Sequence, residues 1–210
     1  MAFLSKKKNE TLPSITPSKI QSATIITSCM EVTGTLQGSD TIHIDGKVFG
    51  DITVSNALVI GQSGFVSGNV KAKNAIINGQ LQGSIECEEI EVMQSGKVSQ
   101  TIYATRAIID GEIEGEVIAK ESITVLENGT LKVSLIKANN ITVHGTIQGK
   151  VVAMELLDIG TKGSVTGEIA VKNIKTAEGG RMVGTMSIYQ ETSAPSIQEV
   201  KEILKEDDEL

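Results

Sequence analysis

Residues 111–131 read GEIEGEVIAKESITVLENGTL, and this stretch decides the fold. Two glycines bracket Ile113 in a Gly-x-apolar-x-Gly motif, and Gly129 begins the next copy. The aliphatic positions between the motifs are Val117, Ala119, Ile123 and Val125. Two-residue spacing within each pair indicates a short strand with one face inward, and the longer jumps between pairs indicate corners. The segment therefore predicts three short strands separated by corners.

The same unit recurs along the chain. Its central apolar residues are Val48, Val66, Leu81, Val98, Ile113, Leu131, Ile147, Val165 and Met182, and a further copy of the motif reads Gly34-Thr-Leu36-Gln-Gly38. Short strands repeated at this interval are typical of a solenoid, because one unit cannot bury its apolar face alone. We predict an all-β, parallel, three-sided β-helix of about nine turns, roughly 43 Å long at about 4.8 Å a turn. An antiparallel sandwich or barrel would not repeat the same offsets.

The corners alternate in length. The last inward residue of one turn and the central residue of the next are four apart at Ile44–Val48 and six apart at Ile60–Val66, and the alternation continues to Val165. At the short corners Gly follows Asp45, Asn78, Asp110 or His144. Asn and Asp tolerate positive φ, so we expect positive φ at these four positions.

Composition predicts the domain boundaries. The three prolines are Pro13, Pro17 and Pro195, while all 21 glycines lie between Gly34 and Gly184. Proline is excluded from sheet interiors, so we predict a basic disordered tail over 1–22, a β-helix polymerisation domain over 23–190 and an acidic tail over 191–210. Residues 196–210 have helix-capping and amphipathic signals, and either cap the rod as a short helix or stay disordered.

The sequence carries few signs of chemistry. A net charge of −7 argues against a nucleic-acid surface. The sequence also has no Gly-Lys-Ser/Thr motif of the kind that binds phosphate. Cys29 and Cys87 lie too far apart in sequence to suggest a metal site, and Cys87 falls on an inward position as a small hydrophobe. His43 is expected to point outward, and His144 occupies a corner. We therefore predict no catalytic residue, no cofactor and no metal.

Two other functions compete with assembly. Val48, Val54, Ile60 and Val66 fit the six-residue period of a hexapeptide-repeat acyltransferase, but the advance of four from Ile77 to Leu81 breaks that period. The other alternative is a monomeric β-solenoid binding module. Phe49 and Phe65 flank inward positions in this ring-poor chain, so their exposed rings would suit a lateral or partner surface.

The ends of such a rod are templates for another molecule. An uncapped β-helix exposes unpaired backbone groups above an open apolar core, and no amphipathic helix precedes the first turn as a cap. The predicted polymer interface consists of Ile25, Ile26, Met30 and Val32 at the N-terminal end and Met182, Met186 and Ile188 at the C-terminal end. The expected partner at each end is another copy of the chain.

These motifs, the proline-free core with proline-bearing tails and the start Met1-Ala-Phe3-Leu4-Ser-Lys6-Lys7-Lys8 resemble the bactofilins, bacterial polymer-forming cytoskeletal proteins. The resemblance implies a right-handed, three-sided β-helix with disordered tails. It also implies end-to-end polymerisation without nucleotide, often into filaments that lack overall polarity. Such filaments scaffold cell-shape or cell-wall machinery at the membrane.

The N-terminus supports membrane contact by its own chemistry. Met1, Phe3 and Leu4 supply apolar insertion, and Lys6, Lys7 and Lys8 attract anionic lipid at about 1 kcal/mol each. No apolar run reaches the length of a membrane helix or a signal peptide. By their chemistry alone these residues also fit an ordinary solvated lysine-rich tail, and it is the resemblance to bactofilins that favours membrane contact. With that resemblance we expect a cytoplasmic protein, peripheral at the inner face of the cytoplasmic membrane.

Overall fold

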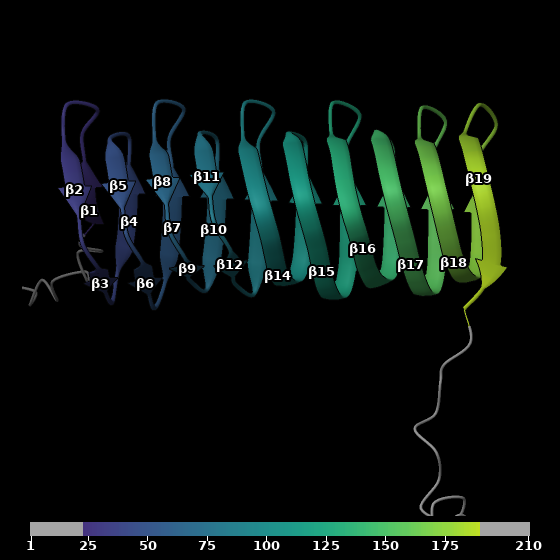
Figure 1. Ribbon diagram of the computed structural model, residues 1–210, viewed down its shortest axis with the longest axis horizontal. Coiled ribbons are helices and arrows are strands. Elements are labelled where there is room, and N and C mark those ends of the chain that lie inside the picture. Colours follow the sequence, from purple (N-terminus) through teal and green to yellow (C-terminus); the bar gives the residue numbers. More distant parts are fainter. Residues whose placement is uncertain (1–22, 190–210) are drawn as a thin grey trace, which may run out of the picture.

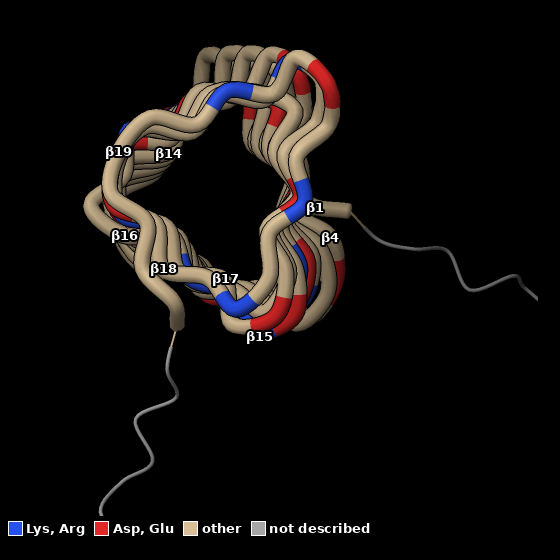
Figure 2. Tube along the Cα trace, turned by 90° about the vertical axis from the view of Figure 1, so that its right-hand side faces the viewer, with Lys and Arg blue, Asp and Glu red and all other residues tan. Residues whose placement is uncertain are grey.

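A computed structural model describes residues 23–189, which form one parallel β-solenoid of about ten turns (Figure 1). The strands stack side by side along the rod, and the described chain begins at one end and finishes at the other. Seen along the rod, the outline has three sides (Figure 2). The predicted fold class is confirmed.

Each side of the rod is a parallel sheet with its own set of strands. The first face contains β1 (Ala23–Ile26), β4 (Thr41–Ile44), β7 (Ala57–Ile60), β10 (Asn74–Ile77) and β13 (Glu89–Val92). The second contains β2 (Glu31–Thr33), β5 (Lys47–Phe49), β8 (Phe65–Ser67) and β11 (Gln80–Gln82). The third contains β3 (Leu36–Gly38), β6 (Ile52–Val54), β9 (Val70–Lys71) and β12 (Ile85–Glu86).

In the second half of the rod the strands run on through the corners. They are β14 (Lys97–Ile109), β15 (Glu112–Val125), β16 (Thr130–Val143), β17 (Thr146–Ile159), β18 (Ser164–Thr176) and β19 (Arg181–Ile188). Each of β14 to β18 contributes a segment to the second, third and first faces in turn, whereas β19 serves only the second and third.

The core consists of aliphatic columns that run along the rod. On the second face Val48 pairs with Val66, Val66 with Leu81 and Leu81 with Val98, and each of these side chains is buried. Among the described residues no polar or charged side chain is buried. A core of this kind needs no internal hydrogen bonds between side chains, so inside the rod the turns are held together by shape and apolar area, and in its walls by the backbone hydrogen bonds of the parallel sheets.

The first turn begins earlier than the motif count indicates. Val32 pairs with Val48, so Val32 is the first central residue and brings the rod to about ten turns. Leu36 instead pairs with Ile52 on the third face. The copy Gly34-Thr-Leu36-Gln-Gly38 is therefore out of register with the other copies, because Gly34 holds the place of their second glycine.

The expectation of positive φ at the short corners is wrong. Asp45, Asn78, Asp110 and His144 are not among the positive-φ residues, which are mostly the second glycines of the motif, such as Gly149 at φ 136°. At Gly149 an added Cβ would also lie 1.7 Å from the Val133 carbonyl oxygen. Gln100 takes this corner position with φ 103°, the one described non-glycine residue with positive φ. The second glycine therefore turns the chain between the second and third faces.

The predicted alternation of corner lengths is confirmed, and long corners project from alternate turns along one edge (Figure 1). Each long corner closes with a backbone hydrogen bond, as from Gly64 N to Gly61 O at 2.8 Å. The short-corner side chains lie beneath them, and Asn128 Nδ2 donates to Asp110 Oδ1 at 3.1 Å. At the C-terminal end two long corners, 160–163 and 177–180, follow each other, so the alternation stops there.

Candidate assembly surfaces

Both ends of the rod carry strands with a partner on one side only. At the N-terminal end β1, β2 and β3 pair with β4, β5 and β6, and within residues 23–189 nothing covers their other edges. At the C-terminal end, within the part of the chain that the structure describes, β19 pairs with β18 alone, and residues 173–176 of β18 pair with β17 alone. Such edges carry unpaired backbone donors and acceptors that favour the addition of another strand.

The C-terminal turn exposes residues that hold core positions. Met182, Met186 and Ile188 pair with the buried Val165, Ile169 and Val171, so they share the inward register. They are nevertheless 39%, 53% and 78% exposed, because within the described residues no further turn covers them. The sequence analysis missed Ile174, which pairs with the buried Leu157 and is also exposed. Its inward offset from Val165 would have identified it.

The N-terminal turn is different. Ile26 is 4% exposed and Val32 is half-buried, and both lie in the inward register through their pairing with Ile44 and Val48. Ile25 pairs with His43 on the outward side of β1 and is exposed.

Four further positions complete the description of this end. Met30 is exposed on the first long corner. The inward positions that the sequence analysis missed are Thr24 and Leu36, which pair with Ile42 and Ile52, and Gly38, which pairs with Val54.

Lysine, arginine, aspartate and glutamate residues are distributed around the whole outline of the rod (Figure 2). On the second face Glu112 lies between Lys97 and Lys132, with Nζ–Oε distances of 2.9 and 3.5 Å. The hydrogen bond and charge of Lys97, followed by those of Lys132, lower the pKa of Glu112. The same pairing raises the pKa of Lys97. Ion pairs between neighbouring turns thus reinforce the parallel register from outside.

The two phenylalanines of the early turns point outward as predicted. Phe49 and Phe65 come from neighbouring strands of the second face, and their ring centroids lie 5.8 Å apart. Phe49 is exposed, whereas Phe65 is half-buried. Their role as a partner surface remains a prediction.

Both histidines are half-buried and lie near corners between the first and second faces. His43 Nε2 lies 3.1 Å from Asp45 Oδ2, so the outward position predicted for His43 is where the structure places it. The His144 ring packs so closely on Gly160 that a Cβ there would lie 2.2 Å from His144 Nδ1. Each histidine therefore has a packing or pairing partner at a corner.

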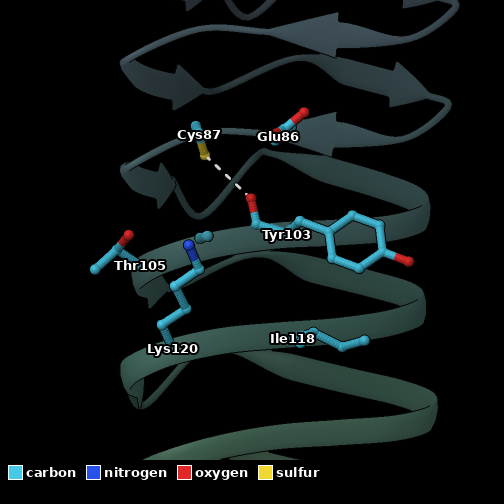
Figure 3. A pocket seen from close by; sticks show the side chains of 7 residues that line it. Glu86, Cys87, Tyr103, Thr105, Ile118 and Lys120 are labelled. Carbon is cyan, nitrogen blue, oxygen red and sulfur yellow. Dashed lines mark hydrogen bonds between the residues drawn. The ribbon is translucent and has the colours of Figure 1, made fainter.

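Cys87 borders a shallow groove between the third and first faces (Figure 3). The side chains around it come from three successive turns, with Glu86 and Cys87 above Tyr103, and Ile118 and Lys120 below. Cys87 packs against the core, and its Sγ lies 3.9 Å from the Tyr103 carbonyl oxygen. Burial, and then the charge of Glu86, raise the pKa of this thiol to about 12. Cys29, by contrast, is exposed on the first long corner.

The predicted membrane-contact residues Met1, Phe3, Leu4, Lys6, Lys7 and Lys8 lie outside the described residues, as does the predicted C-terminal helix. Over residues 23–189 no helix has the length and apolar character needed to span a membrane. In the same range no group of three or more His, Cys, Asp or Glu side chains is placed to hold a metal ion.

Comparison with known proteins bears on these surfaces. A family model described as "Bactofilin: Polymer-forming cytoskeletal" matches residues 24–110 and again residues 100–187. The protein named Bactofilin BacP, from Myxococcus xanthus (strain DK1622), is 35% identical over 66 residues, which are 31% of this chain and 28% of that protein. The two family matches together extend over nearly all of the described rod.

Proposed function

Because the chain belongs to the bactofilin family of polymer-forming cytoskeletal proteins, we propose that it is a scaffold whose rods join end to end into filaments without nucleotide. The observation that carries this proposal is the open C-terminal turn. Met182, Met186 and Ile188 hold core positions there, yet within the described residues no turn covers them. In the proposed filament, the end turn of a second rod covers these side chains.

The energies favour a contact that uses both side chains and strand edges. Burying one large aliphatic side chain completely contributes at most about 1.5–3 kcal/mol. Association itself costs about 4–15 kcal/mol in lost freedom of motion. The three terminal side chains are already partly buried, so covering them offsets only part of that cost. The remaining apolar contacts and the hydrogen bonds of the strand edges supply the rest. No nucleotide is needed, because the rod presents these groups in its folded state.

Electron microscopy with sedimentation tests the assembly. The purified chain, without nucleotide or metal, is expected to form filaments a few nanometres wide. Met186→Arg or Ile188→Arg is expected to abolish them and to leave the β-rich fold intact, because a charge then occupies the end contact. Ser187→Arg is the matched control, since Ser187 lies between them and pairs with Ala170 on the outward side. Filaments that persist in both end variants would contradict the proposal.

We further propose that the filament binds the inner face of the cytoplasmic membrane through its N-termini. One tail, with Phe3, Leu4 and three lysines, binds weakly, but a filament displays many copies, and each later contact is effectively intramolecular. Deletion of residues 1–8 is expected to abolish binding to vesicles that contain anionic lipid and to leave filaments unchanged. Equal vesicle binding by the truncated chain would refute the membrane contact.

The role that fits a membrane-bound, non-enzymatic filament is to organise cell-shape or cell-wall machinery. A rod of about ten turns offers long outward faces on which partner proteins can be arrayed at fixed intervals. In a bacterium that makes the chain, Met186→Arg is expected to disperse the filament and to change cell shape, whereas Ser187→Arg is not. Normal shape in cells that lack the filament would contradict this role.

A further inference from the structure

We propose that the N-terminal segment, residues 1–8, docks in a groove on the first face of its own rod, and that this contact competes with the membrane for the segment. The inference rests on the proposed membrane contact and adds its regulation. Three features carry it: the lining of the groove, a carboxylate without a partner in that lining, and the place at which the described chain begins.

The groove runs along the rod axis on the first face. It crosses β10, β13 and the first-face segments of β14 and β15. Its floor is backbone, because the residues between its two walls, such as Ala75 and Ala107, point inward. One wall is polar and carries the ion pair between Glu89 and Arg106. The other wall is the outward column Ile76, Glu91, Ile108 and Thr124.

The second wall places a carboxylate between two apolar side chains. Ile76 and Ile108 are 36% and 43% exposed, so this wall carries apolar surface that the described rod leaves uncovered. Glu91 pairs with both in the parallel register and is half-buried. Among the described residues the Glu91 carboxylate has no ion-pair or hydrogen-bond partner, whereas Glu89 has Arg106. Such a carboxylate favours a nearby cation, so this wall fits a ligand with both apolar groups and positive charge.

Residues 1–8 have this chemistry. Phe3 and Leu4 are apolar, and three consecutive lysines follow at 6–8. The other segment that lies outside the described residues, 190–210, carries seven carboxylates and two lysines, so the charge of Glu91 disfavours it. Charge therefore selects the N-terminal segment as the occupant.

The N-terminal segment also has the length to reach the groove. The described chain begins with Ala23 in β1, on the same first face as the groove. Along this face β10 lies three turns beyond β1 and Thr124 lies six turns beyond it, which is about 14–29 Å at about 4.8 Å a turn. Residues 9–22 span up to about 46 Å when extended. Residues 1–8 therefore reach the whole groove of their own rod.

The direction of the chain sets the order of the contacts. Because the segment enters the groove from the end at β1, its lysines come first and Phe3 lies further along. With Lys6 opposite Glu91, an extended segment places Leu4 and Phe3 about 7 and 10 Å beyond that carboxylate, beside Ile108 and Thr124. The apolar groups then meet apolar surface, and the lysine meets the carboxylate.

The docked segment is withheld from the membrane. The tether keeps the segment near the groove at a millimolar effective concentration, so a contact of millimolar affinity is occupied about half of the time. Only the undocked fraction binds lipid, which lowers the apparent affinity of a single rod about two-fold. A filament overcomes this competition because its many copies bind the membrane together. The groove therefore favours membrane binding by filaments over binding by single rods.

Disulfide trapping in the full chain tests the docking. Cys29→Ser and Cys87→Ala remove the native thiols, and Ala2→Cys and Thr124→Cys place one thiol in the segment and one at the far end of the groove. The matched control carries Thr130→Cys instead of Thr124→Cys, since Thr130 is also a half-buried threonine but lies on the second face. Below the assembly concentration, the 2–124 disulfide is expected to form within one chain about five-fold faster than the 2–130 disulfide. Equal rates, or no 2–124 disulfide, overturn the proposal.

The same assay identifies a different occupant. Ser196→Cys in place of Ala2→Cys moves the probe to the C-terminal segment. A 196–124 disulfide that forms more slowly than the 2–124 disulfide supports selection by charge. A 196–124 disulfide that forms faster assigns the groove to the C-terminal segment and overturns the proposal.

Vesicle binding by single rods tests the competition. Ile108→Ser is expected to raise the affinity for vesicles that contain anionic lipid about two-fold, because a larger fraction of the segments is undocked. Ile118→Ser is the matched control, since Ile118 is also an outward isoleucine but lies on the third face, and it is expected to leave the affinity unchanged. Loss of apolar surface alone would not strengthen membrane binding. Unchanged or lower affinity of Ile108→Ser overturns the competition.

The membrane contact itself is judged separately. If deletion of residues 1–8 abolishes vesicle binding, but the chain shows neither the 2–124 disulfide nor the gain in Ile108→Ser, the proposed function stands and this inference fails. If the truncated chain binds vesicles as well as the full chain does, the membrane contact fails, and the 2–124 disulfide still decides whether the segment docks.

Discussion

Ile136 and Met186 occupy the same inward column of the third face, yet their surroundings are opposite. Ile136 lies in the middle of the rod between the turns before and after it and is fully buried, whereas Met186 lies in the last turn and is 53% exposed. Nothing in their local pattern distinguishes them. The difference shows that in a solenoid a residue of a core column is exposed wherever no further turn covers it, and such residues are the ones that the proposed end-to-end assembly uses.

The largest expected difference follows from placing a charge at these two positions. Ile136→Arg is expected to prevent stable folding, because an unpaired charge in an aliphatic core cannot be solvated. Met186→Arg is expected to melt within a few degrees of wild type, because its side chain is already half in solvent. Circular dichroism melts of the two variants measure this. Equal losses of melting temperature would show that the last turn is as closed as the middle.

The reactivities of the two cysteine thiols provide a second comparison between the middle of the rod and its end. Burial raises the pKa of Cys87 to about 12, against an ordinary value of 9.0, so the thiolate fraction at pH 8 is about a thousand-fold below that of an ordinary thiol. Cys29 is exposed at the N-terminal end. Reaction with a thiol reagent is expected to be fast for one equivalent and slow for the second until the protein unfolds. Two equally fast equivalents would contradict the packing of Cys87.

Substitution of two glycines compares how well the backbone tolerates a side chain in the middle of the rod and at its end. Gly149→Val is expected to cost more than about 3 kcal/mol, since φ is 136° and the Val133 carbonyl oxygen lies where the Cβ would go. Gly38→Val at the N-terminal end is expected to cost the single rod less than about 1 kcal/mol, because Gly38 does not have positive φ and a Cβ there would lie 3.4 Å from Ile42 Cδ1. Urea unfolding at a concentration below assembly gives both values. A small loss for Gly149→Val would mean that the corner between the second and third faces can open.

Acid is expected to weaken the ion pairs on the outside of the rod. Lys97 and Lys132 lower the pKa of Glu112, so the stability that this pairing contributes is present above the ordinary pKa of 4.5. It is lost as the pH falls below that value through the lowered pKa of the folded state. The melting temperature of wild type is therefore expected to exceed that of Glu112→Gln at pH 7, and the gap is expected to narrow as the pH is lowered below 4.5. A gap that does not change on acidification would assign the effect to packing.

Much of the assembly surface could be predicted from the sequence, because inward offsets repeat from turn to turn. The offsets identified Met182, Met186 and Ile188 as members of the core columns, and the structure places them there in an open turn. The offsets did not show that Ile25 points outward or that Ile26 is covered. The reason is that the first turn lacks the first glycine of the motif, which marks the other turns. Leu36 was assigned to the wrong face for the same reason.

The sequence by itself determined the three short strands per unit, the aliphatic columns and the alternation of long and short corners, because each of these is a local spacing along the chain. Only the tertiary structure decided which residues of one turn lie on which residues of the next. That register depends on backbone contacts between turns: an added Cβ at Gly149 would meet the Val133 carbonyl oxygen of the preceding turn, which explains why the second glycine takes positive φ.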